Sequence, residues 1–144
     1  MLYNTTMNII EQSQNFCLNY LFCLKKVAGM FHISQSQAIC LNLIPNQGIS
    51  QADLAKKLSL DVSTLSRNLN HLIKLNLINK KNSSLDKRSY KINLSTKGIE
   101  FYKAFNEEMY NQLQTIFSAI SVDEKEQFVE ILNKINWQFE LYEQ

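Results

Sequence analysis

Residues 49–98 constrain the fold most, because this stretch divides into short segments with clear beginnings and ends. Ser50 is a typical N-cap, and Asp53 follows at the position of the acid in a capping box, with Asp in place of the usual Glu or Gln. The helix that they begin would have an inner face of Ala52, Leu54, Ala55 and Leu58. A short turn that ends at Asp61 then leads to a second helix, which Asp61 or Ser63 would cap.

The second helix, over about residues 62–75, has two faces of opposite character. With successive residues about 100° apart, an apolar side forms from Val62, Leu65, Leu69, Leu72 and Ile73. The opposite side and its flanks hold Ser63, Thr64, Ser66, Arg67, Asn70, His71 and Lys74. This outer face contains no acid, whereas a helix that is merely solvated would normally include Glu or Asp. Hydroxyl, amide and cationic groups of this kind donate to phosphates and reach base edges in a DNA major groove.

A β-hairpin is predicted after this helix. Asn76 suits the end of the helix, since Asn tolerates the left-handed conformation. Residues 77–81 are typical of one strand and residues 89–94 of another, and a polar, basic loop joins them. One face of the second strand carries Tyr90, Ile92 and Leu94. Two short helices, a tight turn and such a hairpin indicate a winged helix-turn-helix.

Long helices are predicted on both sides of this stretch, because only three glycines and one proline interrupt the 144 residues. We expect helices over residues 5–28 with a break at Gly29, after the N-cap Ser34, over residues 97–120, and after the capping box from Ser121 to Glu124. Residues 16–24 are apolar nearly all round. A helix of this kind is buried on more than one side, and a partner subunit is the simplest source of the second side.

The basic charge is concentrated in the central stretch. Between Ser50 and Gly98, ten lysines and arginines stand against three aspartates, a net charge of +7. The remainder carries five lysines and ten acids, a net charge of −5. A basic middle between acidic arms is typical of a polyanion-binding module, although a solvated charged surface would give the same count.

The central stretch also carries the motifs of a known family. They are Ala52-Asp53-Leu54-Ala55-Lys56-Lys57-Leu58, Thr64-Leu65-Ser66-Arg67-Asn68-Leu69, Leu77-Ile78, and Asp86-Lys87-Arg88 followed by Leu94-Ser95-Thr96-Lys97-Gly98. Residues 51–98 resemble the MarR family of bacterial winged-helix regulators. The most specific match is an Asp-x-Arg wing that leads into a Leu-Ser/Thr-x-x-Gly turn.

The resemblance implies a mainly α fold with a small β-hairpin wing and long N- and C-terminal dimerisation helices. It implies one domain over residues 1–144, with residues 5–48 and 99–144 as the helical dimerisation region and residues 49–98 as the DNA-binding lobe. It further implies an obligate homodimer whose two winged lobes bind a pseudo-palindromic operator in double-stranded DNA.

The candidate DNA-binding residues fall on the second helix and on the wing. They are Ser63, Thr64, Ser66, Arg67, Asn70, His71, Lys74, Asp86, Lys87 and Arg88. Arg67 is the first choice for a guanine or phosphate contact, since a guanidinium can be bidentate to either. Arg88, at the hairpin tip, should enter a minor groove, with Asp86 on the same side of the strand to orient it. The alternatives are a solvated helix face and a surface ion pair of little energetic weight.

The cysteines and histidines indicate no metal site or disulfide framework. Cys17, Cys23 and Cys40 form no CxxC pair, and the default for such thiols is a small buried hydrophobe. The functional alternative is an oxidant or electrophile sensor centred on Cys17, where some MarR relatives place a sensing thiol. His32 and His71 are isolated, and the chain lacks a P-loop, GxGxxG or GxSxG motif, so we expect neither a cofactor nor an enzyme.

The sequence therefore predicts a cytoplasmic, homodimeric transcriptional regulator. We expect a repressor that a small-molecule inducer or thiol oxidation releases from DNA. No apolar run of about eighteen residues is present, so no membrane association is expected. The rival interpretation is a winged-helix architectural or protein-interaction module without sequence-specific DNA recognition.

Overall fold

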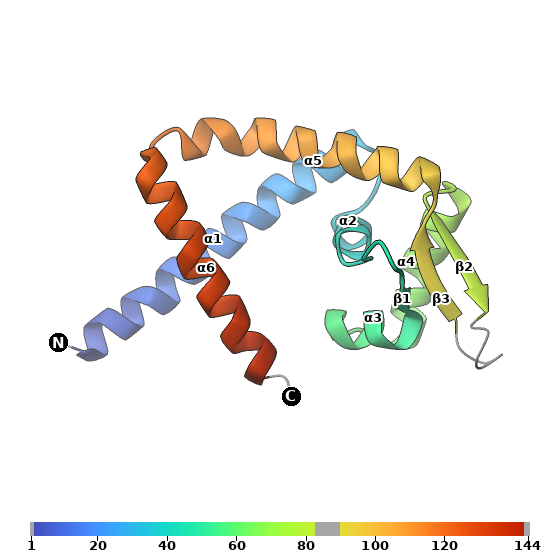
Figure 1. Cartoon of the computed structure of the whole chain (residues 1–144), viewed down its shortest axis with the longest axis horizontal. Coiled ribbons are helices and arrows are strands. Elements are labelled where there is room, and N and C mark those ends of the chain that lie inside the picture. The colour runs from blue at the N-terminus through green and yellow to red at the C-terminus, as the bar shows by residue number, and fades with distance from the viewer. Residues whose placement is uncertain (1, 83–89, 143–144) are drawn as a thin grey trace. The chain divides into compact units, whose positions relative to one another are not determined.

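The computed structural model describes residues 2–82 and 90–142 (Figure 1). The chain forms two compact units, Met1–Met109 and Tyr110–Gln144. In chain order the elements are α1 (Leu2–Met30), α2 (Gln35–Asn42), β1 (Ile49–Ser50), α3 (Gln51–Leu58), α4 (Val62–Lys74), β2 (Ile78–Asn82), β3 (Tyr90–Leu94), α5 (Thr96–Phe117) and α6 (Val122–Tyr142). The predicted mainly α fold with a small wing is confirmed.

The first unit has its core where α2, α3 and α4 meet the C-terminal half of α1 and the sheet. The buried side chains include Leu24, Val27, Ala38, Leu41, Leu54, Leu65, Leu69, Leu72, Ile92 and Phe105. Burial of a large aliphatic side chain stabilises the fold by about 1.5–3 kcal/mol. Phe31 closes this core against α5, with its ring centroid 5.3 Å from that of Phe101 and 5.4 Å from that of Phe105.

The end of α1 differs from the predicted break at Gly29. The helix continues through Gly29 to Met30, and the turn that follows includes His32, which adopts a left-handed conformation with φ of 57°. The amide of Ile33 then donates to the carbonyl of Ala28 at 3.0 Å. A glycine inside a helix costs only about 1 kcal/mol, so the packing of α1 outweighs it, and the chain turns where its carbonyls are capped.

The sheet has three strands in the order β1-β3-β2, all antiparallel, so the predicted two-stranded hairpin was incomplete. The additional strand, β1, pairs Ile49 with Ile92 and Ser50 with Lys91. A strand of two residues is too short to show an alternating pattern. Gly48 precedes it with φ of +80°, a conformation that favours glycine, and a Cβ there would also displace the side chain of Asn93.

Two predicted core positions lie outside the core. Ala52 of α3 is exposed, and Val62 of α4 is 62% exposed. Both belong to the first turn of their helices, where the helix extends beyond the surface that it packs against. The helical periodicity places them on the inner side but does not show where the packed surface ends.

The second unit contains the end of α5 and the whole of α6. The predicted capping box is confirmed, since the amide of Ser121 donates to Glu124 Oε2 at 2.7 Å and the amide of Glu124 donates to the Ser121 hydroxyl at 3.2 Å. The rings of Phe117 and Phe128 lie 6.1 Å apart across the turn. Within Val122–Tyr142, no residue of α6 is buried.

Candidate nucleic-acid interface

The packing of its apolar inner face holds helix α4 in place. Leu65, Leu69 and Leu72 are between 0% and 1% exposed, and Ile73 is half-buried beside them. These leucines recur at steps of four and three residues, which places them in one stripe. The opposite face of α4 is therefore held towards solvent.

That outer face presents most of the predicted contact residues. Ser63, Arg67, Asn70, His71 and Lys74 are exposed, whereas Thr64 and Ser66 are half-buried. Arg67 and Lys74 give the face a positive charge, and α4 itself contains no acid. The arrangement suits the recognition of a polyanion by donors and cations along one helix.

The N-terminal end of α4 uses two of those residues for its own cap. The Asp61 carboxylate accepts hydrogen bonds from the amide of Thr64 at 2.9 Å, from the Thr64 hydroxyl at 2.7 Å and from the Ser63 hydroxyl. The bonds from Ser63 and Thr64 hold the pKa of Asp61 well below its usual range. While the cap is closed, these two hydroxyls offer lone pairs and not protons, so a phosphate contact through them requires the cap to rearrange.

Ser66 is held by a residue that the sequence did not single out. The amide nitrogen Nε2 of Gln51, on α3, donates to the Ser66 hydroxyl at 3.0 Å. The other amide atom, Gln51 Oε1, is buried and makes no hydrogen bond. This contact joins the two helices of the helix-turn-helix across fifteen residues, and it leaves the Ser66 proton available to an acceptor outside the protein.

The wing contributes exposed cations that are absent from the predicted DNA-binding residues. Lys81 and Lys91 are exposed partners across β2 and β3. On the opposite face, Lys80 Nζ lies 4.1 Å from the ring centroid of Tyr90, which is a cation–π contact. The excess of lysines and arginines counted between Ser50 and Gly98 was the available signal. Asp86, Lys87 and Arg88 lie outside the described residues, so their predicted roles stay predictions.

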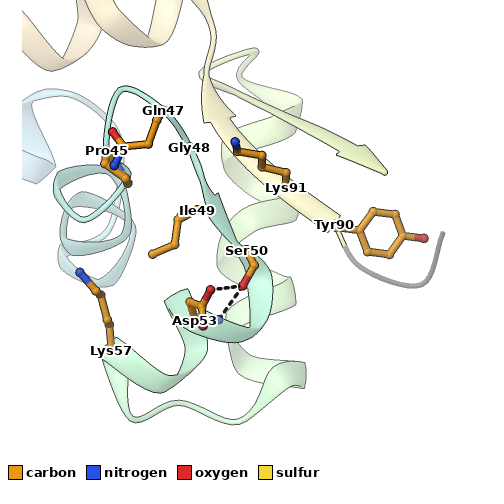
Figure 2. Close-up of a pocket in the computed structure, with 9 residues that line it drawn as sticks. All are labelled: Pro45, Gln47, Gly48, Ile49, Ser50, Asp53, Lys57, Tyr90 and Lys91. Carbon is orange, nitrogen blue, oxygen red and sulfur yellow. Dashed lines mark hydrogen bonds between the residues drawn. The ribbon is translucent and has the colours of Figure 1, made fainter. Parts of the chain in front are cut away.

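A cavity of about 460 Å³ lies between the loop before β1, helix α3 and strand β3. Figure 2 shows Lys57 and Lys91 on opposite sides of it, with Ile49 between them.

The Ser50 hydroxyl accepts from the amide of Asp53 at 3.0 Å and donates to its carboxylate at 2.6 Å. The Asp53 carboxylate thus bonds the Ser50 hydroxyl, which leaves the predicted capping box only half formed. By comparison, α2 has a complete box, because the longer Gln37 side chain reaches the amide of Ser34 at 2.9 Å.

The three cysteines lie in different environments. Cys40 is buried, which raises the pKa of its thiol to about 11. Cys23 is half-buried, and Cys17 is exposed on α1. A raised pKa suppresses the reactive thiolate, so Cys40 is an inert core residue. Within residues 2–82 and 90–142, no three His, Cys, Asp or Glu side chains are grouped as metal ligands would be.

Helices α3 and α4, the turn between them and the strands β2 and β3 define a winged helix-turn-helix protein. The model of the MarR family matches residues 33–89 of the chain. An uncharacterised HTH-type transcriptional regulator of Bacillus subtilis (strain 168), YdgJ, is 25% identical over 104 residues. That alignment covers 72% of this chain and 63% of the relative, so the chain spans less than two thirds of that protein's length.

Solved structures resemble the chain over nearly its whole length. MepR of S. aureus, in a MepR–DNA complex, is 26% identical with a TM-score of 0.67, covering 89% of this chain and 96% of that one. A MarR protein from Peptoclostridium difficile is 23% identical with a TM-score of 0.77, covering 94% and 90% of the two chains, and at that identity the likeness concerns the fold. The chain therefore resembles the MarR family in residues 33–89 and in its fold. None of the described helices is both long and apolar enough to cross a membrane.

Proposed function

We propose that the chain is a homodimeric transcriptional regulator that recognises a specific DNA sequence through α4. The observation that carries the proposal is the division of α4 into two faces. Three buried leucines fix the inner face, and the exposed outer face is free of acid and holds Arg67, Asn70, His71 and Lys74. Side chains of these types form hydrogen bonds with base edges and phosphates in a major groove.

The wing would supplement this contact. Arg88 is the candidate for the minor groove, oriented by Asp86, and Lys87 is the candidate for a phosphate. Ser66 would donate the proton that Gln51 leaves available. The S. aureus MepR–DNA complex supports the assignment, because it shows a relative of the same fold bound to DNA.

Self-association is supported by apolar side chains that the chain does not bury. In α1, Ile9, Leu18 and Phe22 are 62%, 66% and 70% exposed, and in α6, Trp137 and Phe139 are 59% and 61% exposed. Exposed apolar surface of this extent marks an interaction site. A homodimer would cover it and place two copies of α4 roughly 34–36 Å apart, the spacing of successive major grooves.

The regulatory signal is proposed to be a small ligand or oxidation of Cys17, which releases a repressor from its operator. Cys17 is the exposed thiol of the chain, whereas the pKa of Cys40 is raised by burial. Either signal acts by favouring one spacing of the two recognition helices over the other. We assign the regulator to the cytoplasm, where its DNA lies.

Selection of bound duplexes from a random DNA pool, with and without oxidant, tests the proposal. The expected result is enrichment of a pseudo-palindrome with half-sites about one helical turn apart, and loss of binding on oxidation in the wild type but not in Cys17→Ser. Retention of oxidant-induced release in Cys17→Ser would remove Cys17 from the mechanism. An architectural or protein-interaction module is the competing assignment, and it would bind without a large ratio of specific to non-specific affinity.

A further inference from the structure

The C-terminal end of α4 is tied to the beginning of α5. Leu75 caps α4, and Asn76 follows it with φ of 58°. At the end of a helix the last backbone carbonyls have no partner within the helix, and here the carbonyls of Leu75, Asn76 and Leu77 need partners from elsewhere. All three are satisfied from one short segment, because Lys97 Nζ donates to Leu75 O at 3.0 Å, the Ser95 hydroxyl to Asn76 O at 2.6 Å and the Ser95 amide to Leu77 O at 3.0 Å.

The two segments are also in direct backbone contact. A Cβ on Gly98 would lie 1.9 Å from Leu77 O, so only glycine permits the approach. The Ser95 hydroxyl, while donating to Asn76, accepts from the amide of Gly98 at 2.8 Å and so caps α5. The first rung between β2 and β3, Ile78 opposite Leu94, follows at once. The end of α4, the base of the wing and the first turn of α5 therefore form one junction.

Within this junction Lys97 has a distinct position. Ser95 and Gly98 also hold the sheet and the cap of α5, so their substitution would disturb the fold itself. Lys97 is exposed and makes its contact through a flexible side chain alone. Its ammonium group lies at the negative end of the α4 dipole, where a cation is favourable.

We propose that Lys97 is a positioning residue for α4: by holding the Leu75 carbonyl against α5 it sets the orientation in which α4 meets DNA, and it does not itself bind DNA. The proposal rests on the proposed function for its DNA readout. It adds that specificity depends on a residue of α5, outside the helix-turn-helix, and that a movement of α5 is passed to α4 through this contact.

The test compares Lys97→Met, which keeps most of the side-chain stem, with Lys97→Arg, which can still donate, and with Lys103→Met, which removes the same charge from an exposed position of α5. Affinities for the selected duplex and for a scrambled duplex are measured as a function of salt. For Lys97→Met we expect specific affinity to fall by roughly three- to tenfold, the size of one charge-assisted hydrogen bond at a helix end. Non-specific affinity and the salt slope should stay as in the wild type, and Lys97→Arg should restore binding.

A direct phosphate contact gives a different result, because both affinities would then fall and the salt slope would decrease by about 0.9. That result would overturn the proposal, as would specific binding by Lys97→Met equal to that of the wild type. Hydrogen exchange of the Leu75–Leu77 amides gives a readout without DNA. These amides should exchange several-fold faster in Lys97→Met than in Lys103→Met, and equal rates would overturn the proposal. A wild-type chain that enriches no DNA would overturn the proposed function alone.

Discussion

Helices α4 and α6 are both amphipathic, but they differ in how the chain uses their apolar sides. α4 buries Leu65, Leu69 and Leu72 almost completely, whereas α6 buries no residue of Val122–Tyr142. The inner face of α4 is thus covered within the first unit. The apolar side of α6, like that of the first half of α1, remains for another surface to cover. The proposed DNA contact and the proposed dimer interface therefore lie in parts of the chain with different folding requirements.

The largest effect should come from the inner face of α4. Leu69 is 1% exposed, so Leu69→Ala should lower the free energy of unfolding by about 2–5 kcal/mol. Val62→Ala, on the same side of the helix but 62% exposed, should change it by less than about 0.5 kcal/mol. Urea denaturation of both variants measures the contrast. Equal losses would mean that the packed surface of α4 extends to its first turn.

The exposed apolar side of α1 should respond in the opposite way. Leu18→Glu places a charge on a side chain that is 66% exposed, so it should leave the folded chain intact. In the proposed dimer it would bury an unpaired charge and weaken self-association by roughly thirtyfold or more. Sedimentation velocity measures this, with Ser13→Glu, an exposed polar position of α1, as the matched control. A wild-type chain that sediments as a monomer would contradict the proposed dimer.

Substitution of Arg67 tests the outer face of α4 without disturbing the packing of its inner face. Arg67→Ala should reduce affinity for the selected duplex by roughly tenfold to a hundredfold and relax the preference at one base pair. The melting temperature should hardly change, because the side chain is exposed. Gel-shift titration and thermal denaturation of the same preparation test both expectations. A uniform loss for all duplexes would reassign Arg67 to a phosphate.

The sequence predicted the parts of this fold that depend on neighbouring residues. The caps at Ser34, Ser50 and Ser121 each involve a partner three residues away, and the left-handed Asn76 follows from a single residue type. Such signals lie within a few positions of each other. They fix where helices begin and end before any tertiary contact forms.

The unpredicted parts are contacts between distant residues. The Gln51–Ser66 bond joins positions fifteen apart, and the Lys97–Leu75 bond joins positions twenty-two apart. Gly98 was recognised through the family motif, but its close approach to the Leu77 carbonyl became evident only in the structure. Side-chain type does not determine which distant backbone group a lysine or glutamine will meet. For this reason the solvent-exposed face of α4 was predictable from the sequence, and the distant residues that contact α4 were not.

The smallest effect, and the one that compares the two units most directly, concerns their caps at acidic pH. Hydrogen bonds from Ser63 and Thr64 lower the pKa of Asp61, and hydrogen bonds from Ser121 lower the pKa of Glu124. A group whose pKa is lower in the folded state stabilises the protein above its unfolded pKa, and this stability is lost as the pH falls through the folded value. Both caps should therefore contribute fully at pH 7 and progressively less below about pH 4.

The variants Asp61→Asn and Glu124→Gln keep a side chain that can accept the capping bonds but cannot ionise. Each should lower the melting temperature slightly at pH 7 and by progressively less as the pH falls towards 2, with the larger change for Asp61, which accepts more hydrogen bonds. Differential scanning calorimetry over this pH range provides the measurement. If the two units unfold in separate transitions, Asp61→Asn should shift only the transition of the helix-turn-helix and Glu124→Gln only the other. A single transition shifted by both variants would show that α5 couples the recognition helix and α6 into one cooperative unit.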